Sequence, residues 1–201
     1  NARRCRRPHA EHVAVTVDPL SPDEPADVPT PRMLSWAKNS TIYRLERQML
    51  TEKQLAGAIR RKAKAKFDSI TEAQLRACAD FAIKFAYEVG GLDDTAYAGI
   101  ATRSGVRSGR SKRAIAQRLA VKGIARETAT AALEEADDLY AAVVMARKRA
   151  FGPFRKADLD EKRQAKELSA FARGGFGFDL ARKVFGMSLD DAEEILASRR
   201  V

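Results

Sequence analysis

The sequence predicts an all-α protein built from three helical units joined in tandem. From Leu34 onward, apolar residues recur at the three- and four-residue spacing of helices. No stretch of useful length shows the strict alternation that is typical of a half-buried strand. A helix with clear start and stop signals spans residues 110–124, and weaker copies of it lie at 51–62 and 168–176. These three copies are the basis for three units.

The central copy, residues 110–124, contains the signals of a complete short helix. Ser111 can cap its first turn by accepting a backbone N–H bond. Ile115 and Leu119 lie four residues apart and therefore share one face. Gly123 can adopt the left-handed backbone that ends a helix, and the apolar Ile124 then packs back against the last turn. We therefore expect a helix that begins after Ser111 and ends at Gly123.

The other two copies match the central one at its apolar positions. Aligning Gly123 on Gly175 places Leu119 over Phe171, and Ile59 takes the same place in the first copy. The interval between the first two copies is longer than the interval between the second and third. The first unit is therefore expected to carry the extra residues.

Residues 1–33 differ from the rest of the chain and are predicted to be a disordered tail. They hold six of the seven prolines, and X-Pro steps favour extended backbone. Their five arginines balance five acidic residues, so the net charge of +10 belongs to residues 34–201. His9 and His12 are three residues apart in this tail, which is too poor a setting for a metal site.

Local signals place the first helices in order. A first helix is expected over residues 34–49, and capping-box patterns open the next two at Thr51 and Thr71. Gly90-Gly91 ends the third helix. The pair Asp93-Asp94 follows, and one of these aspartates can cap the fourth helix.

The second half of the chain has fewer breaks. Residues 126–150 contain neither Gly nor Pro and are rich in Ala, so periodicity alone does not divide them. Gly152-Pro153 is a clear break, and later helices are expected to run to Arg173, over 178–185 and from Ser188. The units are therefore predicted at residues 34–92, 93–136 and 137–201, the last with an additional C-terminal helix.

The sequence offers no catalytic or cofactor site. The only histidines lie in the predicted tail, so no nucleophile has a histidine base within the helical part of the chain. Adjacent carboxylates such as Asp137-Asp138 point in different directions from a helix, so a metal site that combines them with distant acids is a remote alternative. The glycines Gly105 and Gly109 lack the spacing of a phosphate loop. We expect a protein that is not an enzyme and that holds no cofactor or metal.

Composition narrows the class of protein and its compartment. Cys5 and Cys78 are too few and too far apart for a disulfide framework, so free thiols in a reducing cytoplasm are expected. No apolar run approaches the roughly 20 residues needed to span a bilayer. The net charge of +10 favours an acidic partner, such as a nucleic acid or a protein bound to one. We therefore expect a cytoplasmic monomer without a membrane segment.

The strongest functional signal is a run of basic residues without acids. Between Thr95 and Arg126 there is no Asp or Glu but eight Lys or Arg, which is more than the helix dipole explains. A second basic cluster closes the matching helix of the first copy, and stacked repeats bring equivalent helices side by side. We therefore predict a binding surface made of ten residues: Arg60, Arg61, Lys62, Arg103, Arg107, Arg110, Lys112, Arg113, Arg118 and Lys122.

These segments resemble the RecX family of regulatory proteins. Gly91-Leu92-Asp93-Asp94, followed by Tyr97-Ala98, is similar to a Gly-aromatic-Leu-Asp-Asp block of that family that is followed by an aromatic-Ala pair. In this chain Gly91 stands where the aromatic residue usually falls. The segments 119–124 and 171–176 look like the second and third repeat motifs of the family, and 51–62 looks like the first.

The resemblance extends from about Trp36 to Phe185, and it implies about nine helices in three three-helix units that form an elongated, curved array. Members of the family bind the RecA recombinase filament on DNA, lodge in its helical groove and restrain its activities. No catalytic residue comes with the family. The resemblance thus implies a regulator that inhibits the recombination and ATPase activities of RecA and modulates DNA repair and the SOS response.

An alternative remains open at this point. The basic helices can instead form a stand-alone DNA-binding module that affects RecA only by competing for single- or double-stranded DNA. Titration onto labelled DNA without RecA separates the two hypotheses, because tight and steeply salt-dependent binding favours the second.

Overall fold

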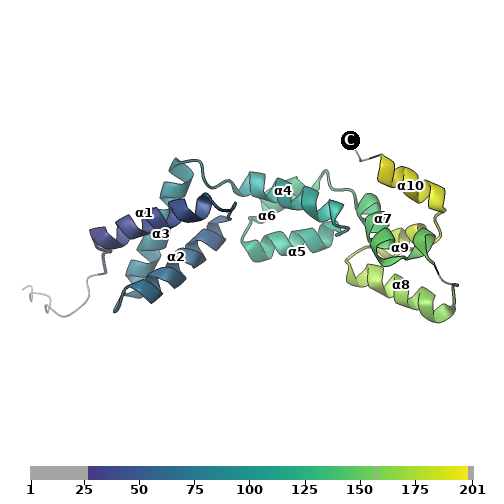
Figure 1. The fold of residues 1–201 in the computed structure, drawn as a ribbon, viewed down its shortest axis with the longest axis horizontal. Coiled ribbons are helices and arrows are strands. Elements are labelled where there is room, and N and C mark those ends of the chain that lie inside the picture. The colour runs from purple at the N-terminus through teal and green to yellow at the C-terminus, as the bar shows by residue number, and fades with distance from the viewer. Residues whose placement is uncertain (1–26, 157, 199–201) are drawn as a thin grey trace, which may run out of the picture.

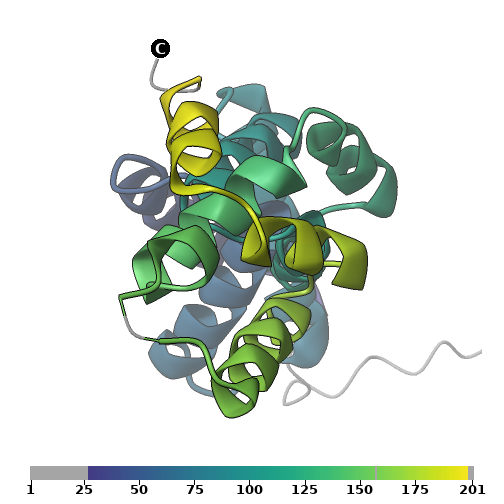
Figure 2. The same cartoon turned by 90° about the vertical axis from the view of Figure 1, so that its right-hand side faces the viewer.

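The computed structural model describes residues 27–156 and 158–198, and the regular structure of this part of the chain is entirely helical. Ten α-helices and one short 3-10 helix follow one another, with no strand among the described residues. The helices form an elongated row of three bundles (Figure 1). Seen from the C-terminal end, the helices cluster around the long axis of the row (Figure 2). The all-α prediction is confirmed.

The first unit consists of α1 (Pro31–Leu45), α2 (Glu52–Lys66) and α3 (Glu72–Glu88). Thr51 and Thr71 each form the expected capping box with the glutamine three residues later. Leu55 and Ile59 of α2 are completely buried and pack in one apolar cluster with Cys78 of α3. Burial raises the pKa of the Cys78 thiol, because a buried thiolate loses its hydration.

Helix α1 begins and ends several residues earlier than the expected 34–49. Thr30 caps it by accepting a hydrogen bond from Met33 N at 3.3 Å, and Pro31 occupies the first turn, where a helix needs no amide donor. The side chain of Gln74 donates to the carbonyl of Val28 at 3.2 Å and so ties the preceding segment to α3. The expectation failed because Pro31 was taken as part of a tail rather than as a helix start. The cysteine and both histidines of that tail, Cys5, His9 and His12, lie outside the described residues.

The second unit consists of α4 (Asp94–Arg107), α5 (Lys112–Lys122) and α6 (Arg126–Leu133). The third consists of α7 (Asp138–Arg149), the 3-10 turn η1 (Gly152–Phe154), α8 (Glu161–Arg173), α9 (Phe178–Phe185) and α10 (Leu189–Ala197). The stretch that periodicity left undivided therefore contains two helices. The division is made by Asp137, whose carboxylate caps α7 by accepting a hydrogen bond from Tyr140 N at 3.0 Å.

The central helix α5 has the predicted start and stop. The hydroxyl of Ser111 accepts a hydrogen bond from Ala114 N at 3.1 Å. Gly123 has a φ of +90°, and the amide of Ile124 donates back to the carbonyl of Leu119 at 3.1 Å. Ile124 is only 5% exposed, so its side chain packs back against the helix end as expected. Helix α2 is one turn longer than α5, which confirms that the first copy carries extra residues.

Within residues 27–156 and 158–198, buried apolar residues form two clusters rather than one. The first cluster lies within the first unit. The second runs from Ala98 to Leu196 and is shared by the second and third units. Because the two clusters are separate in the described part of the chain, the contacts that attach the first unit to the second are largely polar. No described helix is both long and apolar enough to cross a membrane.

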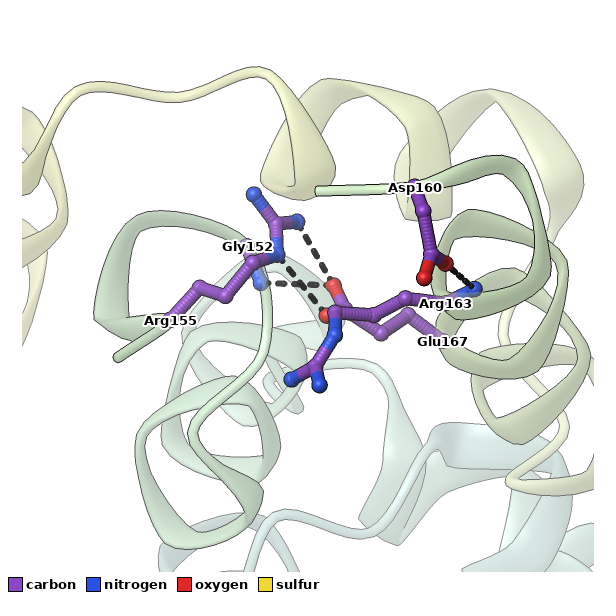
Figure 3. Close-up of polar contacts among 5 residues, drawn as sticks. All are labelled: Gly152, Arg155, Asp160, Arg163 and Glu167. Carbon is purple, nitrogen blue, oxygen red and sulfur yellow. Dashed lines mark hydrogen bonds and ion pairs between the residues drawn. The ribbon is translucent and has the colours of Figure 1, made fainter. Parts of the chain in front are cut away.

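A buried ion pair holds the third unit together (Figure 3). Glu167 of α8 is 1% exposed, and Arg155 donates to its two carboxylate oxygens from Nε at 2.9 Å and from Nη2 at 2.7 Å. The amide of Gly152 donates to the same carboxylate at 2.9 Å. The guanidinium of Arg155 also lies 4.8 Å from the ring centre of Phe185. One carboxylate thus joins α8 to the turn that follows α7, and the arginine extends the contact to α9.

Candidate interaction surface at the unit junctions

The second helices of the three units lie end to end, and the expectation that they lie side by side is wrong. In Figure 1, α2, α5 and α8 follow one another along the same edge of the molecule. The N-terminus of α2 meets the C-terminus of α5, and the N-terminus of α5 meets the C-terminus of α8. The first four amides and the last four carbonyls of a helix lack partners within it. Each junction brings such amides and carbonyls together.

One buried hydroxyl serves both helices at each junction. Thr51 Oγ1 accepts a hydrogen bond from Gln54 N at 3.3 Å and donates to the carbonyl of Lys122 at 2.6 Å. At the second junction, Ser111 Oγ accepts from Ala114 N and donates to the carbonyl of Gly174 at 2.7 Å. Both hydroxyl residues are 0% exposed. At each junction, one hydroxyl residue therefore caps the start of its own helix and also donates to a carbonyl at the end of the second helix of the following unit.

The paired aspartates complete the junctions. Asp93 caps its own helix α4 by accepting from Ala96 N at 2.8 Å. Its neighbour Asp94 instead accepts from the first amide of α2, that of Glu52, at 3.2 Å. Burial raises the pKa of Asp94, and the Glu52 amide partly opposes that effect. One aspartate of the pair thus caps its own unit and the other caps the preceding unit.

The second junction repeats this arrangement with Asp137 and Asp138. Asp137 caps α7, and Asp138 accepts from Lys112 N, the first amide of α5, at 2.6 Å. The carboxylates of Asp137 and Asp138 therefore accept hydrogen bonds from backbone amides at the starts of α7 and α5, in place of the metal that the remote alternative assigned to them. No group of three or more His, Cys, Asp or Glu side chains suited to a metal ion occurs among the described residues.

Asp138→Ala is expected to lower the free energy of unfolding by about 1 kcal/mol, because the amide of Lys112 loses its partner. Urea denaturation followed by circular dichroism measures the change. Asp158→Ala is the matched control, since Asp158 is exposed and precedes the helix start. Equal effects of the two substitutions would contradict the role assigned to Asp138.

Two glycines allow the helix ends to approach so closely. Gly123 and Gly175 both have a left-handed backbone, with φ values of +90° and +83°. A Cβ on Gly123 would lie 2.5 Å from the side chain of Lys53, and one on Gly175 would lie 2.6 Å from Ser111 Oγ. Any other residue would therefore be strained and would also push the two units apart.

The ten residues of the predicted surface stay accessible but do not gather in one place. Eight of them are exposed, and Lys112 and Lys122 are half-buried. Arg60 forms an ion pair with Glu72 at 3.1 Å, so its charge is partly neutralised. The others are distributed over three grooves and the surface between them. Their role in binding remains a prediction.

Two of the grooves lie at the junctions and are lined by basic side chains. The first junction groove, of about 480 Å³, has four such residues: Arg44, Lys53, Arg61 and Lys122. The second junction groove, of about 470 Å³, has five: Arg110, Arg118, Lys148, Arg149 and Arg173. Neither lining contains an Asp or Glu among the described residues. Four of the ten predicted residues, two in each groove, therefore lie in acid-free surroundings.

Arg103 and Arg107 have different surroundings. They line a larger groove of about 1100 Å³ beside α4 and α6, together with Glu127, Glu134 and Glu135. The run from Thr95 to Arg126 contains no acid in sequence, but these glutamates follow it and fold back beside α4. The absence of acidic residues from this run of the sequence therefore does not extend to the surroundings of Arg103 and Arg107 in the structure.

Sequence reasoning left five basic residues of the junction grooves out of the predicted surface: Arg44, Lys53, Lys148, Arg149 and Arg173. All except Lys53 stand in the last turn of a helix, where the helix dipole gives an adequate local explanation for a cation. These residues share two grooves because the second helices of the units stack end to end. Arranging the second helices end to end and then counting the basic residues at each junction would have identified them.

Comparisons with known proteins agree with this architecture. Residues 93–133 match the sequence profile of the family described as RecX, second three-helix domain. A regulatory protein RecX from Agrobacterium fabrum is 61% identical over 169 residues, which are 84% of this chain and 92% of that protein. A regulatory protein RecX from Myxococcus xanthus is 33% identical over 163 residues, 77% of this chain and 87% of its own length. The crystal structure of RecX from Lactobacillus salivarius has the same fold, with a TM-score of 0.61 and 21% identity over 80% of this chain and 99% of that one.

Proposed function

Because this chain belongs to the RecX family of regulatory proteins, we propose that it binds the RecA filament on DNA and inhibits the recombination and ATPase activities of RecA. Such a regulator modulates DNA repair and the SOS response without catalysing a reaction itself. The observation that carries the proposal is the relationship to the Agrobacterium fabrum protein, which spans 84% of this chain.

The shape and charge of the molecule support this function. The elongated row of helices (Figure 1) has a shape that suits the helical groove of a filament. The exposed cations of α5 and of the turn before it are suited to an acidic filament surface, because complementary charge speeds association. Exposed charges are screened over roughly 8–10 Å at physiological salt, so inhibition is expected to weaken as salt rises.

Replacing Arg107, Arg110 and Arg113 together with glutamate is expected to raise the concentration needed for half-maximal inhibition of RecA by about tenfold. All three side chains are exposed, so the substitutions remove attraction and add repulsion without disturbing the core. The measurement is the DNA-dependent ATPase activity of RecA at increasing concentrations of the variant.

The matched control replaces Lys64, Arg76 and Lys84, which are exposed residues of the first unit, with glutamate. It changes the net charge by the same amount at another place. Circular dichroism establishes that both variants are folded. Undiminished inhibition by the folded variant of Arg107, Arg110 and Arg113 would count against the proposed function.

A further inference from the structure

The two junction grooves share a chemistry that the proposed function leaves unassigned. Each is bordered by the second helix of one unit and the C-terminal end of the second helix of the next. Each contains four or five basic side chains and no acid among the described residues. From this we infer that each junction groove is a binding site for phosphate groups of a nucleic-acid backbone.

The polar groups of the grooves favour an anion. In the first junction groove, Arg44, Lys53, Arg61 and Lys122 bring cationic groups from α1, α2 and α5 to one lining. Such groups bind phosphate oxygens through strong, charge-assisted hydrogen bonds. In the second junction groove, Arg110, Arg118, Arg149 and Arg173 provide guanidinium groups from three elements, α5 with its preceding turn, α7 and α8. Several convergent guanidinium groups suit the oxygens of phosphate.

A nucleic-acid backbone fits these sites better than an acidic protein segment. Duplex DNA presents about one negative charge per 1.7 Å of its axis, a density that protein carboxylates do not reach. The two linings are neighbours along α5, because the second junction groove extends to Arg118 and the first begins at Val121. Helix α5 has 11 residues and is therefore about 17 Å long. A duplex, with a phosphate about every 3.4 Å along each strand, presents several phosphates over such a short distance.

The linings also indicate what kind of recognition to expect. Neither junction groove is lined by a Phe, Tyr or Trp from the described residues, so neither offers a platform on which bases can stack. The glutamines Gln48, Gln54 and Gln117 add neutral polar groups. Contacts of this kind position a protein on the backbone but do not read its sequence. Binding is therefore expected to be independent of base sequence and steeply dependent on salt.

The test measures binding of the full chain to fluorescein-labelled 20-base-pair duplexes of two unrelated sequences, in the absence of RecA. One variant carries Arg61→Ala and Lys122→Ala in the first junction groove, and a second carries Arg118→Ala and Arg149→Ala in the other. Each is expected to weaken binding about tenfold and to reduce the slope of log K against log salt by about 2. The two duplexes should give the same result.

The control variant carries Arg76→Ala and Lys84→Ala, which remove the same charge from the exposed face of α3 and line neither groove. It should bind the duplexes within about twofold of the unchanged chain. Equal effects of the control and the groove variants would overturn the inference, as would unchanged binding by folded groove variants. Groove variants that lose RecA inhibition but keep DNA affinity would assign the grooves to a protein partner and overturn it as well. Because this assay contains no RecA, a loss of duplex binding and a loss of RecA inhibition are measured separately. A variant that loses the first and keeps the second would also show that inhibition does not arise from competition for DNA.

Discussion

Replacing Glu167 with alanine is expected to lower the free energy of unfolding by about 3–5 kcal/mol, the usual cost of removing one partner from a buried ion pair. The carboxylate is 1% exposed and accepts three hydrogen bonds, two from Arg155 and one from the amide of Gly152. Its removal leaves the Arg155 side chain, which is only 15% exposed, without its counter-charge. Urea denaturation followed by circular dichroism measures the loss.

The charge of Glu167 also makes a testable contribution to the pH dependence of stability. Burial alone would raise the pKa of this carboxyl, but hydrogen bonds from Arg155 and Gly152 and the charges of Arg155 and Arg163 hold the pKa below its ordinary value. A lowered folded-state pKa gives stability that is complete above the unfolded pKa, about 4.3, and is lost as the pH falls through the folded pKa. In Glu167→Gln this part of the acid-induced loss should be absent.

Glu161→Ala is the control for Glu167, because Glu161 lies in the first turn of the same helix and is exposed. It should change the free energy of unfolding by about 0.5 kcal/mol or less. An effect of Glu167→Ala no larger than this would mean that the ion pair contributes little to the fold.

Local signals predicted the helix starts and stops because caps act over three or four residues. Thr51, Thr71 and Ser111 each cap the helix that their sequence motif indicated. Gly123 has the predicted left-handed backbone. Periodicity alone did not divide residues 126–150 into helices, because they contain neither Gly nor Pro. The predicted unit boundary after residue 136 nevertheless lies in this stretch, and Asp137-Asp138 there repeats the signal of Asp93-Asp94.

The junctions could not be predicted in the same way, because they join residues far apart in the chain. The hydrogen bond from Ser111 to the Gly174 carbonyl spans 63 residues, and the one from Thr51 to Lys122 spans 71. A sequence pattern shows that Ser111 can cap a helix, but not that its hydroxyl proton has an acceptor in the next unit. The grooves form because the units stack in this way. A prediction based on runs of basic residues in the sequence therefore identified only four of the nine basic residues that line them.

The second large effect is expected at Ser111, whose replacement by alanine should lower the free energy of unfolding by about 2–4 kcal/mol. The loss combines an N-cap, worth about 1 kcal/mol, with the cost of leaving the carbonyl of Gly174 without its donor in a buried site. Because Ser111 lies where the second and third units meet, the contact between these units should loosen too. Hydrogen exchange of the amides at the end of α8 detects that loosening.

Two further substitutions separate the hydroxyl from the side-chain volume. Ser111→Thr should keep most of the stability, because Thr51 fills the equivalent position at the first junction with the same pair of hydrogen bonds. Ser108→Ala is the matched control, since Ser108 is exposed and its hydroxyl only donates to the carbonyl of Ser104 within α4. If Ser111→Ala proved no more costly than Ser108→Ala, the shared hydroxyl would not be what joins the units. The end-to-end stacking of α5 and α8 would then have to depend on the apolar cluster and on the hydrogen bond between Asp138 and the amide of Lys112.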